Sequence, residues 1–114
     1  MKKDIDLLIE EAEKEEKYFQ NYLAYAKQIK GEAEKLLGEV KVFVFGSVLR
    51  KGEVARDIDV LIISPKLTKT SQKSKTLTEV REKIGLFSPF ELHLVSPEEY
   101  QNWYRYFLKE KVEI

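Results

Sequence analysis

The sequence predicts an α/β domain in which helices cover a small mixed β-sheet. Three observations lead to this prediction. A helical pattern fills the N-terminal part of the chain, short apolar runs have strand character, and turn signals or a further helical pattern separate those runs. A chain of 114 residues suffices for one domain with a small core, so residues 1–114 are expected to form a single unit. Within it, residues 1–38 would form a long helix and residues 40–114 the core.

Residues Asp4 to Leu37 carry one continuous helical pattern, and Gly38 is its expected stop. Its apolar positions recur in alternating steps of three and four, with one glutamate among them. They are Ile5, Leu8, Ala12, Glu15, Phe19, Tyr22, Ala26, Ile29, Ala33 and Leu36. Such a helix would be roughly 50 Å long, which exceeds the width of this domain. The half near Gly38 should therefore pack on the core, whereas the N-terminal half should overhang, bend at Gly31 or contact another subunit.

A strand, a turn and a second strand follow the helix. The apolar run over 40–45 suits a strand buried on both faces, and it stops at Gly46-Ser47. A polar connection leads to Asp57, from which β-branched and apolar residues continue to Ile63. Because the connection is short, the two strands are expected to pair antiparallel.

Two acids begin the second of these strands. Side chains alternate along a strand, so Asp57 and Asp59 should project from one face, roughly 7 Å apart along the backbone. Neighbouring carboxylates repel each other unless a cation lies between them. Hard oxygen ligands of this kind suit Mg²⁺ or Mn²⁺.

The end of the first strand offers groups for an anion. Gly46 lets the backbone approach a ligand closely, and amides in a following helical turn would point towards it. Ser47 adds a hydroxyl and Arg50 a guanidinium, which one helical turn would place on the same side. Phosphate-binding groups opposite cation-binding carboxylates predict a site for a magnesium-bound nucleotide.

A second helix and a third strand are expected after the Asp57–Ile63 strand. The lysine-rich connection from Lys66 to Thr76 is interpreted as a solvated loop and helix start rather than a phosphate contact. The helix should begin near Ser71 or Ser74 and end at Gly85. Residues 90–95 then have strand character, with Glu91 and His93 on one face.

The last predicted element is a helix that begins at Ser96. Ser96 and Glu99 have the spacing of a capping box, and Pro97 suits the first turn. Its apolar stripe is expected to belong to the core and to cover the sheet. The stripe consists of Tyr100, Trp103, Tyr104, Phe107 and Leu108.

Composition narrows the functional classes. Lysine plus arginine and aspartate plus glutamate each total 20, so the chain lacks the basic field that favours nucleic-acid binding. The absence of cysteine excludes disulfides and thiol chemistry. No apolar run approaches membrane-spanning length, and the N-terminus lacks the apolar segment of a signal peptide. The protein is therefore expected to be cytoplasmic.

The motif as a whole resembles a known signature. Gly46-Ser47, Arg50, Gly52 and the Asp57-x-Asp59 pair resemble the signature of the DNA polymerase β-like nucleotidyltransferase superfamily. In size the chain is similar to the minimal nucleotidyltransferases that occur with a HEPN-domain partner in toxin–antitoxin pairs. Arg56 departs from the family pattern, which usually has serine before the first acid.

The resemblance implies a fold, a reaction and a set of site residues. The sheet would be of the nucleotidyltransferase type, and Asp57, Asp59 and Glu91 would be catalytic and hold two Mg²⁺ ions, with Mn²⁺ as an alternative. Gly46, Ser47 and Arg50 would bind ATP or another nucleoside triphosphate. AMP would pass to a hydroxyl of a HEPN-type toxin, for which this chain would be the antitoxin.

Other interpretations stay open at this point. The chain could be a non-catalytic or weakly catalytic module that neutralises its partner through the long helix, which could also mediate homo-oligomers. An aminoglycoside-type transferase is disfavoured, because the sequence shows no domain that would select such an acceptor. His93 could orient the nucleotide or assist the acceptor, but a lone histidine is more often structural.

Overall fold

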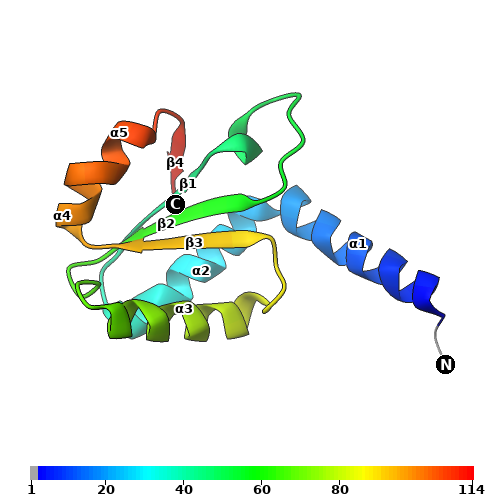
Figure 1. Ribbon diagram of the computed structural model, residues 1–114, viewed down its shortest axis with the longest axis horizontal. Coiled ribbons are helices and arrows are strands. Elements are labelled where there is room, and N and C mark those ends of the chain that lie inside the picture. Colours follow the sequence, from blue (N-terminus) through cyan, green and yellow to red (C-terminus); the bar gives the residue numbers. More distant parts are fainter. Residues whose placement is uncertain (1–2) are drawn as a thin grey trace.

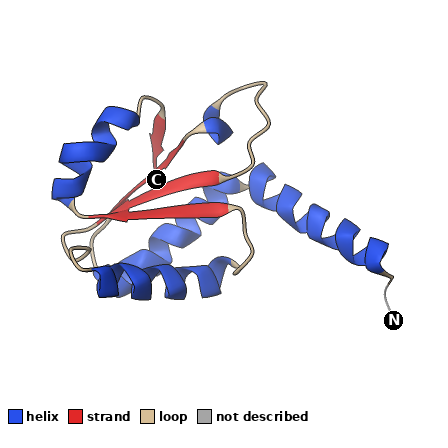
Figure 2. Ribbon diagram, viewed as in Figure 1, coloured by secondary structure: helices blue, strands red, loops and turns tan. Residues whose placement is uncertain are grey.

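The computed structural model describes residues 3–114 and shows helices around a four-stranded sheet (Figure 1, Figure 2). Met1 and Lys2, which begin the predicted 1–38 segment, lie outside the described residues. The helices are α1 (Asp4–Gln20), α2 (Tyr22–Leu37) and α3 (Thr70–Ile84), followed by a C-terminal helical segment. The strands are β1 (Lys41–Phe45), β2 (Ile58–Ile63), β3 (Phe90–Val95) and β4 (Lys111–Glu113).

The sheet is mixed and has the order β3-β2-β1-β4. β1 and β2 pair antiparallel, as expected from their short connection, whereas β2 and β3 pair parallel and α3 forms the crossover between them. The register aligns Phe45 with Asp59 and Asp59 with Glu91. β4 pairs antiparallel with β1 and was not predicted, because its three residues contain a single apolar side chain, Val112.

Helices α2 and α3 cover one face of the sheet (Figure 1). Their apolar side chains pack on alternate residues of the three long strands, which is the pattern that a half-buried sheet requires. The fully buried members include Ala26, Ile29, Ala33, Val42, Val44, Ile58, Val60, Ile62 and Val80. This core fixes β2 and β3 side by side, and the position of the polar residues on their opposite face follows from it.

The C-terminal helical segment covers part of the other face. It consists of α4 (Pro97–Glu99), a π-helical turn η2 (Tyr100–Tyr104) and α5 (Arg105–Phe107). The Ser96–Glu99 capping box is present, as predicted. Leu108 is buried on this face against Phe43, Leu61 and Ile63.

The prediction that the whole aromatic stripe lies in the core is wrong for two of its residues. Tyr100 and Tyr104 are half-buried, but Trp103 is 65% and Phe107 73% exposed. A π-helical turn contains more residues than an α-helical turn. Side chains spaced for an α-helix are therefore not all held on the face that contacts the sheet.

The N-terminal pattern forms two helices, so the expectation of one continuous helix is wrong, and Gly31, where a bend was considered, lies within α2. The break lies at Asn21, whose φ of −119° and ψ of 29° are not helical. Its side-chain amide donates to the Lys17 carbonyl at 3.0 Å and so caps the end of α1.

Helix α1 extends away from the sheet (Figure 1), which confirms the expected overhang. None of its residues is buried, whereas α2 buries four. Near its C-terminal end, the Tyr18 hydroxyl donates a hydrogen bond to the Ile84 carbonyl at 2.9 Å. No helix within residues 3–114 combines the length and apolar character needed to cross a membrane.

Candidate active site

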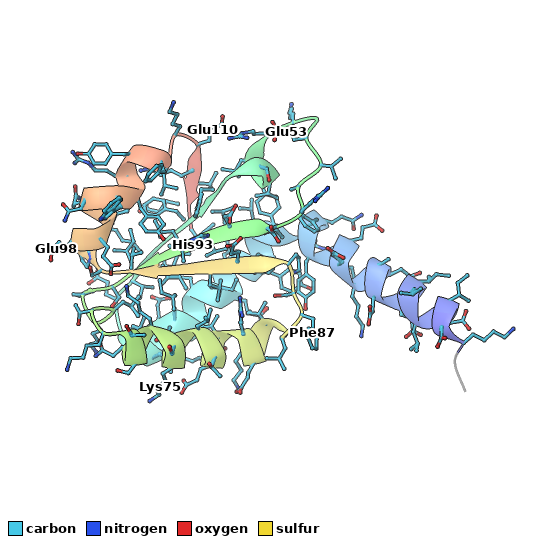
Figure 3. The ribbon with its side chains drawn as sticks, in the orientation of Figure 1. Glu53, Lys75, Phe87, His93, Glu98 and Glu110 are labelled. Atoms are coloured by element: carbon cyan, nitrogen blue, oxygen red, sulfur yellow. The ribbon has the colours of Figure 1, made fainter. Side chains whose placement is uncertain are left out.

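Two acids and a histidine meet on the face of the sheet opposite α2 and α3. Asp59 lies on β2, and Glu91 and His93 lie on the adjacent strand β3. Figure 3 labels His93. Each of the three residues offers one ligand atom, and these atoms all lie within 4.8 Å of one another. The His93 Nε2 lies 3.2 Å from the Asp59 Oδ1. The parallel register explains the cluster, because Asp59 and Glu91 are paired residues and His93 follows two positions later on the same face.

The donor set of this cluster fits a divalent cation. Two carboxylates supply hard oxygen ligands that suit Mg²⁺ or Mn²⁺, and an imidazole is a common ligand for transition metals. Asp59 and His93 remain 23% and 24% exposed, and Glu91 is exposed. A cation and its remaining ligands can therefore approach from solvent.

Asp57 does not belong to this cluster. It precedes β2, is exposed, and is absent from the three residues whose ligand atoms converge. Of the predicted set Asp57, Asp59 and Glu91, the structure brings the last two together and adds His93. The alternation that placed Glu91 and His93 on one face was the signal for this addition.

At the end of β1, the backbone of Gly46 lies directly beside the Asp59 carboxylate. Its φ is +88°, and a Cβ built on it would lie 2.6 Å from the Asp59 Oδ2. Glycine is therefore required both for the backbone conformation and for the close approach. Ser47, the next residue, is half-buried and begins a short 3₁₀ turn, Ser47–Leu49.

Arg50 lies beyond that turn. Its backbone is extended, so Ser47 and Arg50 do not share one helical turn, as the prediction assumed. The guanidinium instead contacts the carboxylates of Glu53, at 3.4 Å, and Glu110, at 3.7 Å. Figure 3 labels both acids near the upper edge of the molecule.

A hollow of about 430 Å³ adjoins the cluster at His93. We call it the aromatic hollow; it is lined by Phe45, His93, Glu99, Trp103, Tyr104, Phe107 and Leu108. His93 contacts two of the rings, with centroid distances of 5.2 Å to Phe45 and 6.0 Å to Tyr104. Sequence reasoning missed the hollow because it placed the whole C-terminal stripe in the core.

Glu99 is held in place by an ion pair. The Lys73 ammonium donates to both carboxylate oxygens, at 2.7 and 2.9 Å, and links α3 to the C-terminal segment. These hydrogen bonds lower the pKa of the Glu99 carboxyl below its usual value. Lys73, predicted to be solvated, is thus the partner of a carboxylate.

Comparisons with known proteins identify the family of the chain. A family model described as a nucleotidyltransferase domain matches residues 26–113, which include the cluster and the aromatic hollow but not α1. No curated protein matches the chain significantly.

Two solved structures are similar in fold. One is a crystal structure described as a candidate nucleotidyltransferase, with 24% sequence identity and a TM-score of 0.66; the match covers 77% of this chain and 95% of that one. The other is a candidate nucleotidyltransferase from Sulfolobus solfataricus, with 19% identity and a TM-score of 0.60, covering 85% of this chain and 82% of that one. At these identities the likeness concerns the fold.

Proposed function

The chain belongs to the nucleotidyltransferase domain family, and from this premise we propose that it transfers AMP from ATP to a hydroxyl of a partner protein. The observation that carries the proposal is the cluster of Asp59, Glu91 and His93 directly beside Gly46. It combines ligands for a divalent cation with a backbone segment that a phosphate group can approach closely.

Asp59 and Glu91 would hold Mg²⁺ or Mn²⁺, with His93 as a third donor. Asp57 is exposed and directly precedes β2, and it is proposed as a further ligand for the second of two ions. A divalent cation bound here would offset negative charge on the triphosphate and on the oxygens of the reacting phosphate. The donor atoms of Asp59, Glu91 and His93, which lie within 4.8 Å of one another, support the first of these cation sites.

The side chains around the cluster have separate roles in the transfer. The Ser47 hydroxyl would donate to a phosphate oxygen, and Arg50 would reach the triphosphate by exchanging its contacts with Glu53 and Glu110. The exposed Glu91 would accept the proton of the acceptor hydroxyl. The acceptor oxygen then forms a bond to the α-phosphorus, the bond to the bridging oxygen breaks, and pyrophosphate leaves.

The acceptor is proposed to be a HEPN-domain toxin, with this chain as its cytoplasmic antitoxin. The resemblance to minimal nucleotidyltransferases suggests the pairing. Helix α1 supports a protein partner, because it lies outside the family match and exposes the apolar side chains of Ile5, Leu8 and Ile9.

The experiment is incubation of the chain with ATP, Mg²⁺ and the protein encoded by the adjacent gene, followed by intact-mass spectrometry of both proteins. We expect the partner to gain the mass of AMP, and Asp59→Asn and Asp57→Ala to prevent the gain. No mass increase on either protein would contradict the proposal.

The second candidate function is neutralisation by binding alone. The exposed apolar face of α1 favours it, since that face could contact a partner without any chemistry. The same variants decide between the two functions. A binding module would still suppress the partner after Asp59→Asn, whereas an enzyme would not.

A further inference from the structure

The aromatic hollow presents rings that the rest of the chain does not cover. Trp103 and Phe107 lie on the C-terminal helical segment and are largely exposed, although both line the hollow. Among the described residues, no ring stacks on either side chain. Large exposed aromatic side chains that converge on a concave surface are typical of a ligand site. A volume of about 430 Å³ suits a small molecule.

The hollow adjoins the proposed active site on the side of His93. Gly46 lies beside the Asp59 Oδ2, since a Cβ on Gly46 would come within 2.6 Å of that oxygen, and Ser47, which would bind phosphates, follows Gly46 in the chain. His93 contacts Asp59 through the other carboxylate oxygen, and the His93 ring also lines the hollow. The order in space is therefore Ser47, Asp59, His93 and then the hollow. A nucleotide with its phosphates at the first two groups would extend its nucleoside towards the last.

The lining of the hollow favours the uncharged base of a nucleotide over its negatively charged phosphates. Within the part of the chain that the structure describes, the lining contains no lysine or arginine. Its one carboxylate, Glu99, is bound to Lys73 and to the Ser96 amide. A phosphate would thus meet a carboxylate without a free cation nearby, whereas a planar, uncharged ring system can stack on the aromatic side chains.

We propose that the aromatic hollow binds the base of the substrate nucleotide, with Trp103 as the stacking surface. This inference rests on the proposed nucleotidyl transfer and names the subsite that holds the nucleoside. The base is favoured over an aromatic acceptor, because the nucleoside is covalently attached to the phosphate at the cluster. The acceptor has a separate approach at Glu91, which is exposed on the outer strand β3.

The single tryptophan of the chain makes a direct test possible. The full chain is titrated with Mg²⁺ and an ATP analogue that has a methylene group between the α- and β-phosphates and so cannot transfer AMP. We expect saturable quenching of Trp103 fluorescence. By calorimetry, Trp103→Ala should weaken binding of this analogue about tenfold, and Trp103→Phe should retain most of the affinity.

Tyr106→Ala is the matched control. Tyr106 is an exposed aromatic residue on the same helical segment, but it does not line the hollow. Its replacement should leave the affinity for the analogue unchanged. Equal losses for Trp103→Ala and Tyr106→Ala would show a general effect on the helix and overturn the inference.

Further outcomes separate this inference from the proposed function. If adenosine alone quenches Trp103 in the wild type and in Asp59→Asn, the base subsite is supported even where no transfer occurs. If AMP transfer is observed but Trp103→Ala binds the analogue like the wild type, the subsite is wrong and the function stands.

A rise in the acceptor KM alone after Trp103→Ala would assign the hollow to the acceptor and overturn the inference. Absence of both quenching and transfer would overturn both proposals.

Discussion

At the scale of single residues, the site depends on how closely Gly46 approaches Asp59. The sequence predicts Gly46, Ser47, Asp59 and Glu91 as site residues, and the structure places Asp59 and Glu91 together, with Gly46 beside Asp59. It could not place Asp57, since one residue decides whether an acid lies inside the strand or before it. The contact of Arg50 with Glu110 could not be predicted either, because the two residues lie far apart in the sequence.

Gly46→Ala tests the close approach. Alanine at a φ of +88° costs about 1–2 kcal/mol, and its Cβ would displace the Asp59 carboxylate as well. We expect a loss of Mn²⁺ affinity together with this loss of stability, measured by calorimetry and by urea unfolding.

Gly52→Ala is the control for backbone strain. Gly52 has a similar φ of +81°, but a Cβ there would have no neighbour within 4 Å. Its substitution should lower the free energy of unfolding by a similar amount and leave Mn²⁺ binding intact. Equal Mn²⁺ affinities for the two variants would show that the approach of Gly46 to Asp59 is unimportant.

The Lys73–Glu99 pair predicts a pH dependence of stability. Because the pKa of Glu99 is lower in the folded state, its stabilisation is fully present above the usual value of 4.5 and is lost as the pH falls through the folded pKa. The difference in unfolding free energy between wild type and Glu99→Gln should therefore shrink below about pH 4.5. For a partly exposed pair it should be about 1 kcal/mol or less at pH 7. A difference that is constant from pH 3 to pH 7, by urea unfolding, would rule out the ion pair as its cause.

At the scale of elements, periodicity predicted most of the structure and failed where geometry is irregular. The strand over 90–95 and the helix stop at Gly38 have the predicted positions. The break at Asn21 was missed because the apolar pattern continues through it without a change of period. The π-helical turn was missed for a similar reason, since it changes the face of Trp103 without any marker such as glycine or proline.

Helices α1 and α2 should differ sharply in their contribution to stability. Ile29 on α2 is fully buried, so Ile29→Ala should lower the free energy of unfolding by about 2–5 kcal/mol. Ile5 on α1 is 62% exposed, and Ile5→Ala should change it by about 0.5 kcal/mol or less. Urea unfolding followed by circular dichroism measures both values. A large loss for Ile5→Ala would mean that the N-terminal part of α1 also packs on the domain in solution.

At the scale of the whole molecule, the chain combines a nucleotidyltransferase domain with a helix, α1, that buries none of its residues and packs against the core through Tyr18 and Phe19 near its C-terminal end. The match to the nucleotidyltransferase domain begins within α2, and α1 projects from the body (Figure 1). The fold class and the face that carries the cluster were predictable, because both follow from alternation in three strands. The aromatic hollow was not, because it depends on how the C-terminal segment sits over the sheet. The acceptor is also outside what one chain's sequence encodes.

The most direct measurement of the central claim compares ATP labelled at the α-phosphorus with ATP labelled at the γ-phosphorus, in the presence of Mg²⁺ and the partner protein. We expect the α label to enter the partner and the γ label to leave as pyrophosphate. Asp59→Asn should lower incorporation of the α label by about 100-fold or more. Incorporation of the γ label, or equal incorporation of the α label by wild type and Asp59→Asn, would contradict the account.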